Sequence, residues 1–487
     1  MIKKNAHVQI AHAKIALAKL NAKKNVQKQN NATVLKKANK NSVKLFFSYN
    51  LIIMNYQINQ IIKDVECKEL SYEGYGVVLL DNYKLFIENF LPGEIADVQL
   101  YKVNSKFAFG KTINLYKRSK LRIPVDDNLI QTGVAPLSIL PYNEQLKFKE
   151  NIVKNLFSRN LNFDKVESIL ASPLQWNYRN KVKILVKQNN GEYIFGAFEK
   201  NTNNFIQLNS FPLANKQIEL FISEFRKFIN ENDYFKDTLK ELTITCSTNN
   251  LFNLIINSIQ PIKFNDSIKT AIIEKFGNLH SIVNISNKQI KEIFKNPKNL
   301  YFNQIDSLNF IVHPFSFFQI NTEQISILYS TLANNMNLKS TDVVLDAYCG
   351  VGTIGLFIAK KVNEIIGIEI IPEATQNAKL NAKLNKINNA EFYAGDIDLV
   401  IKRQNKLFNK IIVDPPREGL TDNFINKILE YSPEEIGYIS CNPHTMVRDI
   451  QKLIQKDYQI DYVKPVDMFP QTFHIECVAV LSKKKSE

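Results

Sequence analysis

The sequence predicts an α/β fold with a doubly wound, Rossmann-like sheet, preceded by a small β-barrel and a central α+β region. Three observations carry this prediction. The C-terminal third alternates strand and helix patterns, residues 56–119 hold several short β-rich segments, and residues 175–320 mix the two kinds of pattern. Strands that alternate with helices form parallel sheets covered on both faces, whereas short strands separated by turns form barrels or sandwiches.

Residues 1–53 differ in composition from the rest and are rich in Lys, Asn and Ala. They hold eleven lysines, no arginine and no acidic residue. Without those lysines the chain has 51 basic and 47 acidic residues, so its net charge falls from +15 to +4. A basic tail can bind phosphates, but a segment with so little to bury is expected to be disordered. We favour disorder, with Met54 as an alternative start.

Cysteine, histidine and hydropathy patterns exclude several classes of protein. The cysteines contain no CxxC pair and the six histidines form no ligand-spaced cluster, so we expect neither a disulfide framework nor a zinc site. A reducing cytoplasm is the expected setting. No run of about 18 apolar residues occurs, so no membrane partner is expected. The first residues lack the apolar core of a secretory signal and the arginines of a mitochondrial transit peptide.

Residues 55–119 predict a small barrel of the oligonucleotide-binding type. Four or five short strands are separated by turn signals at Asp81-Asn82 and Pro92-Gly93. Aromatic residues and lysines are mixed in this segment, and such a surface can stack bases and meet phosphates. For any single aromatic, a place in the barrel core is the more common outcome. The residues concerned are Tyr72, Tyr75, Phe107, Phe109, Lys84, Lys102, Lys106 and Lys111.

Residues 120–320 are expected to form the central α+β domain. Residues 143–159 have helical periodicity with paired Glu and Lys, and strand-like segments follow from residue 181 onward. Trp176, Tyr178, Arg179 and Lys181 stand together just before the first of these strands. They suit contact with RNA and equally suit a cap on the sheet.

Residues 321–487 are expected to form the doubly wound domain, with its ligand site at the carboxyl ends of the strands. The run DAYCGVGTIG, residues 346–355, follows a strand and opens a helix. Its glycines allow a tight turn and a close approach of backbone to ligand. Glu369 ends the next strand, where a carboxylate can accept both ribose hydroxyls. Asp396 ends the third strand, where it can face an adenine amino group.

The fourth strand ends in Asp414-Pro415-Pro416-Arg417. Two prolines after an acidic residue form a rigid extended loop. Methyltransferases that act on planar nitrogen bases often carry such a tetrapeptide, and those that methylate amino groups usually have an aromatic residue after the prolines. Here Arg417 follows instead, which favours a different chemistry. A dehydrogenase would also explain a glycine-rich turn, but it would leave this loop without a role.

Two further residues suit methylation of carbon 5 of a uracil. That carbon is a weak nucleophile until a thiolate adds to carbon 6, and a base must later remove the carbon 5 proton. Cys441 stands at a predicted strand end, where the following helix start can lower its pKa. Glu476 stands in an apolar run, where burial can raise its pKa. Each alone is more often structural, but together with the cofactor motifs they favour catalysis.

The motifs FFQIN, DAYCGVGTIG, IGIE, DPPREGL, SCNP and MFPQTFHIE resemble, in order and context, the RNA uracil-5 methyltransferase family. The resemblance covers the chain from about residue 56 onward. It implies that Cys441 is the nucleophile, that Glu476 is the base, and that S-adenosyl-L-methionine is the cofactor. The residues it implies for cofactor binding are Gln319, Tyr348, Gly350, Gly352, Thr353, Glu369, Asp396 and Asp414.

The N-terminal barrel resembles the TRAM domain of this family. Members with that domain typically act on 23S ribosomal RNA, so we expect a monomeric enzyme with 23S ribosomal RNA as substrate. Many such members bind an iron–sulfur cluster through four cysteines, but no cysteine occurs here between Cys67 and Cys246. Residues such as Thr132 and Ala135 stand in place of ligands, and a cluster requires thiolates, so we expect none. Two alternatives stay open: a methyltransferase for the tRNA T-loop, and a non-catalytic RNA-binding protein on the same scaffold.

Overall fold

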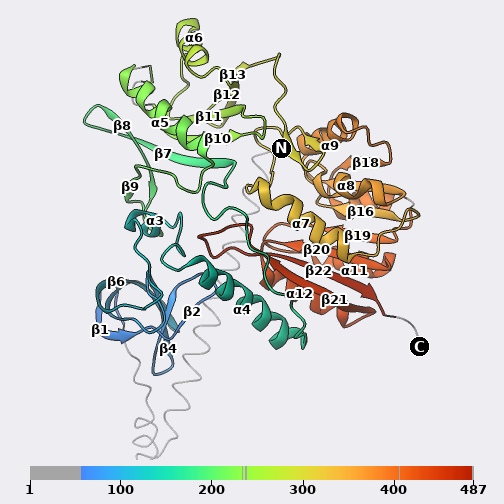
Figure 1. Cartoon of the computed structure of the whole chain (residues 1–487), viewed down its shortest axis with the longest axis horizontal. Coiled ribbons are helices and arrows are strands. Elements are labelled where there is room, and N and C mark those ends of the chain that lie inside the picture. The colour runs from blue at the N-terminus through green and yellow to red at the C-terminus, as the bar shows by residue number, and fades with distance from the viewer. Residues whose placement is uncertain (1–55, 233, 236–237, 405, 485–487) are drawn as a thin grey trace, which may run out of the picture. The chain divides into compact units, whose positions relative to one another are not determined.

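The computed structural model describes residues 56–232, 234–235, 238–404 and 406–484. The predicted basic arm, residues 1–53, lies outside the described residues. The described chain contains three large β-sheets with their helices, and one small hairpin of β14 (Asn303–Ile305) and β15 (Leu308–Phe310). Figure 1 shows these elements in sequence order along the colour bar. No described helix is long and apolar enough to cross a membrane.

The first sheet forms the N-terminal barrel, and its core is small and aliphatic. Leu85, Ile87, Ala96, Val98 and Leu100 alternate along two strands and are fully buried, as period-two patterns require. All strand pairs are antiparallel except the parallel pair of β4 with β6. The order is β1 (Ile61–Glu66), β5 (Ile95–Val103), β6 (Phe107–Lys117), β4 (Tyr83–Glu88), β3 (Gly76–Leu80) and β2 (Glu69–Leu70).

The second sheet is the centre of the α+β region and packs against an aromatic core. Helices α5 (Lys216–Glu231) and α6 (Asp266–Lys275) share that core, since Phe221 of α5 lies 4.9 Å from Phe276, which follows α6. A short helix, α3 (Asp127–Gln131), precedes this region. The strand order is β13 (Gln289–Lys295), β12 (Leu279–Ser286), β11 (Phe252–Ser258), β10 (Leu239–Cys246), β7 (Lys181–Asn189), β8 (Glu192–Phe198) and β9 (Phe205–Gln207).

The third sheet is the predicted doubly wound sheet. Its first five strands are parallel, and the last two are antiparallel to their neighbours. The chain leaves β16 to one side through β17 and later returns to its other side through β19, so a topological switch point lies between β16 and β19. The order is β18 (Ala390–Ala394), β17 (Glu364–Glu369), β16 (Val343–Ala347), β19 (Lys410–Val413), β20 (Glu435–Ser440), β22 (Glu476–Lys483) and β21 (Tyr458–Val466).

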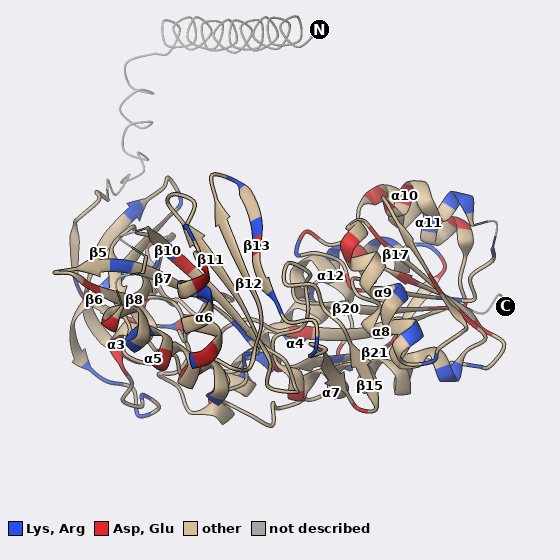
Figure 2. Ribbon diagram, turned by 90° about the horizontal axis from the view of Figure 1, so that it is seen from above, with Lys and Arg blue, Asp and Glu red and all other residues tan. Residues whose placement is uncertain are grey.

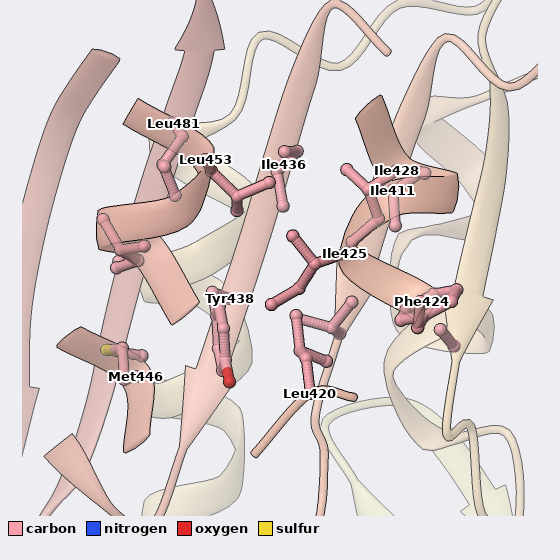
Figure 3. Close-up of a cluster of buried hydrophobic side chains, with 14 of the residues drawn as sticks. Ile411, Leu420, Phe424, Ile425, Ile428, Ile436, Tyr438, Met446, Leu453 and Leu481 are labelled. Carbon is pink, nitrogen blue, oxygen red and sulfur yellow. The ribbon is translucent and has the colours of Figure 1, made fainter. Parts of the chain in front are cut away.

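Helices cover both faces of this sheet, which explains why its strands are almost continuously apolar. One core lies beneath α4 (Tyr142–Leu161), α10 (Ile397–Val400), α11 (Asp422–Tyr431) and α12 (Pro443–Ile454). Figure 3 shows side chains of α11 and α12 packed against those of β19, β20 and β22. The opposite core lies beneath α7 (Thr322–Asn335), α8 (Thr353–Ile358) and α9 (Pro372–Leu384). Two 3₁₀ turns, Ala359–Lys361 and Ile401–Arg403, follow α8 and α10.

Helix α4 shows where the linear division of the chain differs from the packing. It stands in the sequence between the barrel and the central sheet, within the predicted span 120–320. Its buried residues Val153, Phe157 and Leu161 nevertheless belong to the core of the doubly wound sheet. The next segment forms single parallel bridges to β21, Val166 with Val463 and Leu170 with Val466. This stretch therefore packs with the C-terminal sheet.

Candidate active site

The glycine-rich turn after β16 adopts backbone conformations that explain its composition. Tyr348, Gly350 and Gly352 have φ values of 63°, 55° and 81°, in the left-handed region that glycine adopts at no steric cost. A Cβ on Gly352 would lie 2.9 Å from the Phe392 ring, whereas a Cβ on Gly350 would meet no atom within 4 Å. The turn therefore has open space in front of Gly350, where a ligand can approach the backbone.

Glu369, at the end of β17, reaches across to this turn. Its Oε2 accepts the Gly350 N–H at 3.1 Å and its Oε1 accepts the Ile371 N–H at 2.9 Å. Each carboxylate oxygen keeps a lone pair for a further donor. Thr353, the first residue of α8, lies with its hydroxyl 2.9 Å from that of Tyr329 on α7. The structure thus brings Glu369, Tyr348, Gly350, Gly352 and Thr353 together at one strand edge.

The remaining predicted cofactor residues have different surroundings. Gln319 is buried, and its backbone carbonyl accepts a hydrogen bond from the Asn180 amide at 2.9 Å. Asp396 is exposed, and its Oδ1 accepts the Asp398 N–H at 2.9 Å, so it caps α10. That capping role alone is enough to explain an Asp at this position. Gln319 joins the segment before α7 to the central sheet.

Cys441 and Glu476 lie opposite each other at the end of the β20–β22 ladder. The last pair of this antiparallel ladder is Ser440 with Cys477, so the next position along the register sets Cys441 against Glu476. Residues opposite each other in such a ladder have Cβ atoms about 5 Å apart. Glu476 is 2% exposed, and its Oε2 is buried without a hydrogen-bond partner among the described residues. Two residues that are 35 positions apart in the sequence thus share one site.

The Asp414–Gly419 loop closes the site from the adjacent strand β19. The Asn442 amide, 3.0 Å away, and the Thr445 hydroxyl, 3.3 Å away, both donate to the Arg417 carbonyl. Asn442 also caps α12 by accepting the His444 N–H. The loop is therefore attached to the helix start that follows Cys441. The guanidinium group of Arg417 lies 3.4 Å from His474 Nδ1.

The thiol of Cys441 differs from the expectation drawn from the sequence. Its pKa is raised to about 12, first by burial and then by the nearby carboxyls of Glu476 and Asp414, against the opposing effect of Arg417. The net direction is therefore opposite to the lowered pKa that the sequence led us to expect. The main physical reason is burial, which disfavours the charged thiolate, and the two acidic neighbours add to it.

Three acids, of which Asp346 and Glu476 are buried and Asp414 is partly buried, lie in this part of the sheet. The pKa of Asp346 is raised to about 7, mainly by burial and also by nearby Asp414, against the hydrogen bond from the Gly355 N–H. Burial also raises the pKa of Asp414 to about 7. The pKa of Glu476 is raised by burial and by repulsion from Asp414, which agrees with the direction expected from its apolar run. A cationic ligand would relieve this repulsion, so the residues present suit a positively charged sulfonium.

The Tyr72 side chain belongs to the site although it comes from the barrel. Its ring packs edge-on to His444 with centroids 4.6 Å apart, and its centroid is 6.4 Å from that of Phe473. Burial raises the pKa of Tyr72 to about 12, and the next contribution comes from Cys441. The sequence indicated this residue only as one aromatic of a mixed surface. Nothing local in the sequence signals that its neighbours lie more than 370 residues away.

Basic side chains gather near the same site. The pKa of His474 is lowered to about 4, first by burial and then by repulsion from Arg417, Lys149, Arg179 and Lys200. The Lys200 ammonium lies 3.9 Å from the Tyr75 ring centroid and 5.9 Å from that of Phe473. Figure 2 shows basic and acidic residues interspersed over the described chain. The positive charge near His474 is therefore a local feature.

A large cavity lies elsewhere. It has a volume of about 790 Å³ and lies between β12, β13, the segment before α7 and the start of α9. None of the predicted catalytic or cofactor residues lines it. The side chains of Cys441, Glu476 and Glu369 lie at strand ends of the third sheet, so we assign the active site to that edge.

Comparisons with known proteins identify the family of this chain. Residues 141–484 match the model of the tRNA (Uracil-5-)-methyltransferase family, and residues 62–113 match the TRAM domain. An uncharacterized RNA methyltransferase of Lactobacillus johnsonii is 38% identical, with 88% of this chain and 99% of the relative covered. One of Enterococcus faecalis is 35% identical, with 88% and 99% covered.

A solved structure has the same fold. It is the Pyrococcus abyssi tRNA (uracil-54, C5)-methyltransferase in complex with S-adenosyl-L-homocysteine. Its TM-score is 0.69 at 24% identity, with 86% of this chain and 100% of that chain covered. The chain therefore belongs to the RNA uracil-5 methyltransferase family and is an S-adenosylmethionine-dependent RNA (uracil-5-)-methyltransferase with an N-terminal TRAM domain.

Proposed function

We propose that this enzyme methylates carbon 5 of a uridine in 23S ribosomal RNA through a covalent bond from Cys441 to carbon 6. The observation that carries the mechanism is the placement of Cys441 opposite Glu476 at the end of one strand ladder. The TRAM domain supports the choice of ribosomal RNA, because the TRAM-bearing enzymes that the chain resembles typically act there. The enzyme works as a cytoplasmic monomer in this proposal.

The Cys441 thiolate adds to carbon 6 of the uracil, and the electrons of the double bond between carbons 5 and 6 move toward carbon 5 and the carbonyl at carbon 4. Bound S-adenosylmethionine would supply the methyl group to carbon 5, with the S–CH3 bond breaking and its electron pair staying on the sulfur of S-adenosylhomocysteine as the leaving group. Glu476 removes the proton from carbon 5, the double bond re-forms, and the bond from carbon 6 to sulfur breaks. Because burial raises its pKa, the Glu476 carboxylate is a stronger base than an exposed one.

The cofactor position follows from the residues at the first strand edge. Glu369 orients its carboxylate through two backbone N–H groups and keeps lone pairs for ribose hydroxyls. The open space at Gly350 accommodates the ligand against the backbone. Burial raises the pKa of Asp414 and of Glu476, and a bound sulfonium cation would favour the ionised form of both carboxyls. Asp396 is assigned to the adenine with its side chain also capping α10.

Two variants test the catalytic assignment, because they should fail in different ways. Cys441→Ala removes the nucleophile, so no covalent complex should form with radiolabelled RNA and S-adenosylmethionine. Glu476→Gln keeps the nucleophile but removes the base, so a methylated RNA–protein adduct should accumulate and survive SDS gel electrophoresis. The double variant should lose that adduct. An adduct with Cys441→Ala, or normal turnover in either variant, would reject the mechanism.

The choice of RNA has a separate test. The structure with a TM-score of 0.69 is named as a tRNA (uracil-54, C5)-methyltransferase, so the tRNA T-loop is the second candidate substrate. Mass mapping of 23S ribosomal RNA and of tRNA from a deletion strain distinguishes the two. Loss of one 5-methyluridine from 23S ribosomal RNA is expected, whereas loss from tRNA alone would replace the proposed substrate.

A further inference from the structure

The turn between β2 and β3 of the barrel contacts the two segments that carry the proposed catalytic residues. Within residues 71–75, the Gly74 and Tyr75 N–H groups donate to the Ser71 carbonyl and hydroxyl, at 2.9 Å and 3.1 Å. Gly74 has a φ of 75°, so the turn reverses tightly at a residue without a Cβ. A tight, hydrogen-bonded turn of this kind holds the Tyr72 side chain in a defined position.

This turn is packed against the catalytic loop. A Cβ on Gly74 would lie 3.0 Å from Leu137 and 3.9 Å from the Phe473 Cβ. The Leu137 N–H donates to the Gln471 carbonyl at 3.0 Å. The turn therefore contacts the segment 471–473, which leads directly into Glu476.

Tyr72 lies between the two proposed catalytic segments. His444, three residues after Cys441, contacts its ring with centroids 4.6 Å apart. The ring centroid of Phe473, three residues before Glu476, lies 6.4 Å from that of Tyr72. The Tyr72 ring thus bridges the start of α12 and the loop before β22.

The Tyr72 hydroxyl has no hydrogen-bond partner among the residues that the structure describes. By contrast, the hydroxyls of Tyr101 and Tyr116 in the same barrel donate to Glu88 and Asp97. Cys441 and Glu476 both disfavour ionisation of the Tyr72 phenol, and burial does so most strongly, raising its pKa to about 12. The Tyr72 phenol is therefore protonated at neutral pH, and its O–H can donate a hydrogen bond to a ligand.

We propose that Tyr72 is a substrate-positioning residue: its ring forms one wall of the uracil pocket, and its hydroxyl donates a hydrogen bond to a carbonyl oxygen of the target uracil. This inference rests on the proposed function and extends it, because it makes the TRAM barrel part of the active site. A pocket assembled from the barrel and the methyltransferase sheet exists only when both are docked. Uracil suits the pocket, since its two carbonyl oxygens are acceptors for a phenol.

The test compares Tyr72→Phe with Tyr116→Phe in the full-length enzyme. Each variant receives RNA containing 5-fluorouridine at the target position, together with S-adenosylmethionine. In this RNA fluorine replaces the hydrogen at carbon 5, and a base cannot remove it as it removes a proton. The covalent adduct therefore persists, and its rate of formation can be measured in a single turnover. The matched control is suitable because Tyr116 is 63% exposed and its hydroxyl is bound to Asp97.

Loss of one hydrogen bond should slow adduct formation by Tyr72→Phe about 10-fold at saturating RNA. Its Kd for RNA and for S-adenosylmethionine should stay within about twofold, and Tyr116→Phe should behave as the wild type. A Tyr72→Phe rate within twofold of wild type, or a defect confined to the Kd for RNA, would overturn the positioning role. Absence of any adduct with the wild-type enzyme would instead overturn the covalent mechanism itself.

Discussion

The ammonium group of Lys149 on α4 lies 2.6 Å from Oδ1 of Asp467, at the end of β21, and both side chains are fully buried. The same ammonium donates to the Phe469 carbonyl at 3.0 Å. Helix α4 is thereby attached to the segment that leads through His474 to Glu476. A buried pair of this kind stabilises a fold only while both partners are present, because either charge alone is costly in a site without water.

Lys149→Met should therefore destabilise the protein by about 3–5 kcal/mol, since Asp467 would be left buried without its partner. Chemical denaturation followed by circular dichroism measures the change. Lys149→Met combined with Asp467→Leu should recover most of the loss. The matched control is Lys147→Ala on the same helix, whose Lys is exposed and paired only with Glu144, and it should change stability by less than about 1 kcal/mol. Equal effects of both single variants would contradict this account.

Cys441 should be the thiol that reacts with iodoacetamide in the folded protein, because the other four cysteines are buried. The thiolate is the reactive form, and burial raises the Cys441 pKa to about 12. Alkylation should therefore accelerate about tenfold per pH unit between pH 7 and 9. Glu476→Gln removes one group that raises this pKa, so it should speed labelling at fixed pH. Mass spectrometry of the labelled peptide measures the labelling rate of the wild type across this pH range and that of Glu476→Gln at fixed pH. A wild-type rate that stops rising below pH 8 would show that the thiol is already ionised there.

Lys200 should contribute to RNA binding through its charge. Its ammonium lies against the rings of Tyr75 and Phe473 and has no carboxylate partner within 4.0 Å among the described residues. Lys200→Gln should weaken RNA binding and reduce the slope of log K against log salt by about one. The control is Lys456→Ala, an exposed lysine after the far end of α12. An unchanged slope for Lys200→Gln would mean that this lysine serves the packing of the barrel alone.

The purified protein should be colourless and free of stoichiometric iron, even when prepared without oxygen. Thr132 ends α3 with its hydroxyl donating to the Asn128 carbonyl, and Ala135 is fully buried in a small apolar cluster. Neither side chain supplies the thiolate that an iron–sulfur cluster needs. Visible absorption of a [4Fe–4S] centre with matching iron content would contradict the prediction.

Local sequence patterns predict many of the residues of the candidate site. The left-handed turn at Gly350 and Gly352, the acid at the end of β17 and the proline loop at Asp414 each depend on a few neighbouring residues, so their positions could be predicted. The burial of Glu476 could also be predicted from the sequence, because this residue stands in a continuous apolar run. The sequence indicated a barrel of four or five strands, and the structure has six, since β2 is only two residues long.

The sequence alone determined the class of fold and the edge of the sheet at which the chemistry-bearing residues gather, because periodicity and strand-end motifs are local properties. Only the tertiary structure decided that α4 packs with the methyltransferase sheet, that Tyr72 reaches His444, and that the pKa of Cys441 rises. These features depend on pairs of residues more than about 30 positions apart. Burial and electrostatic interaction act through distance in space, which no local pattern records.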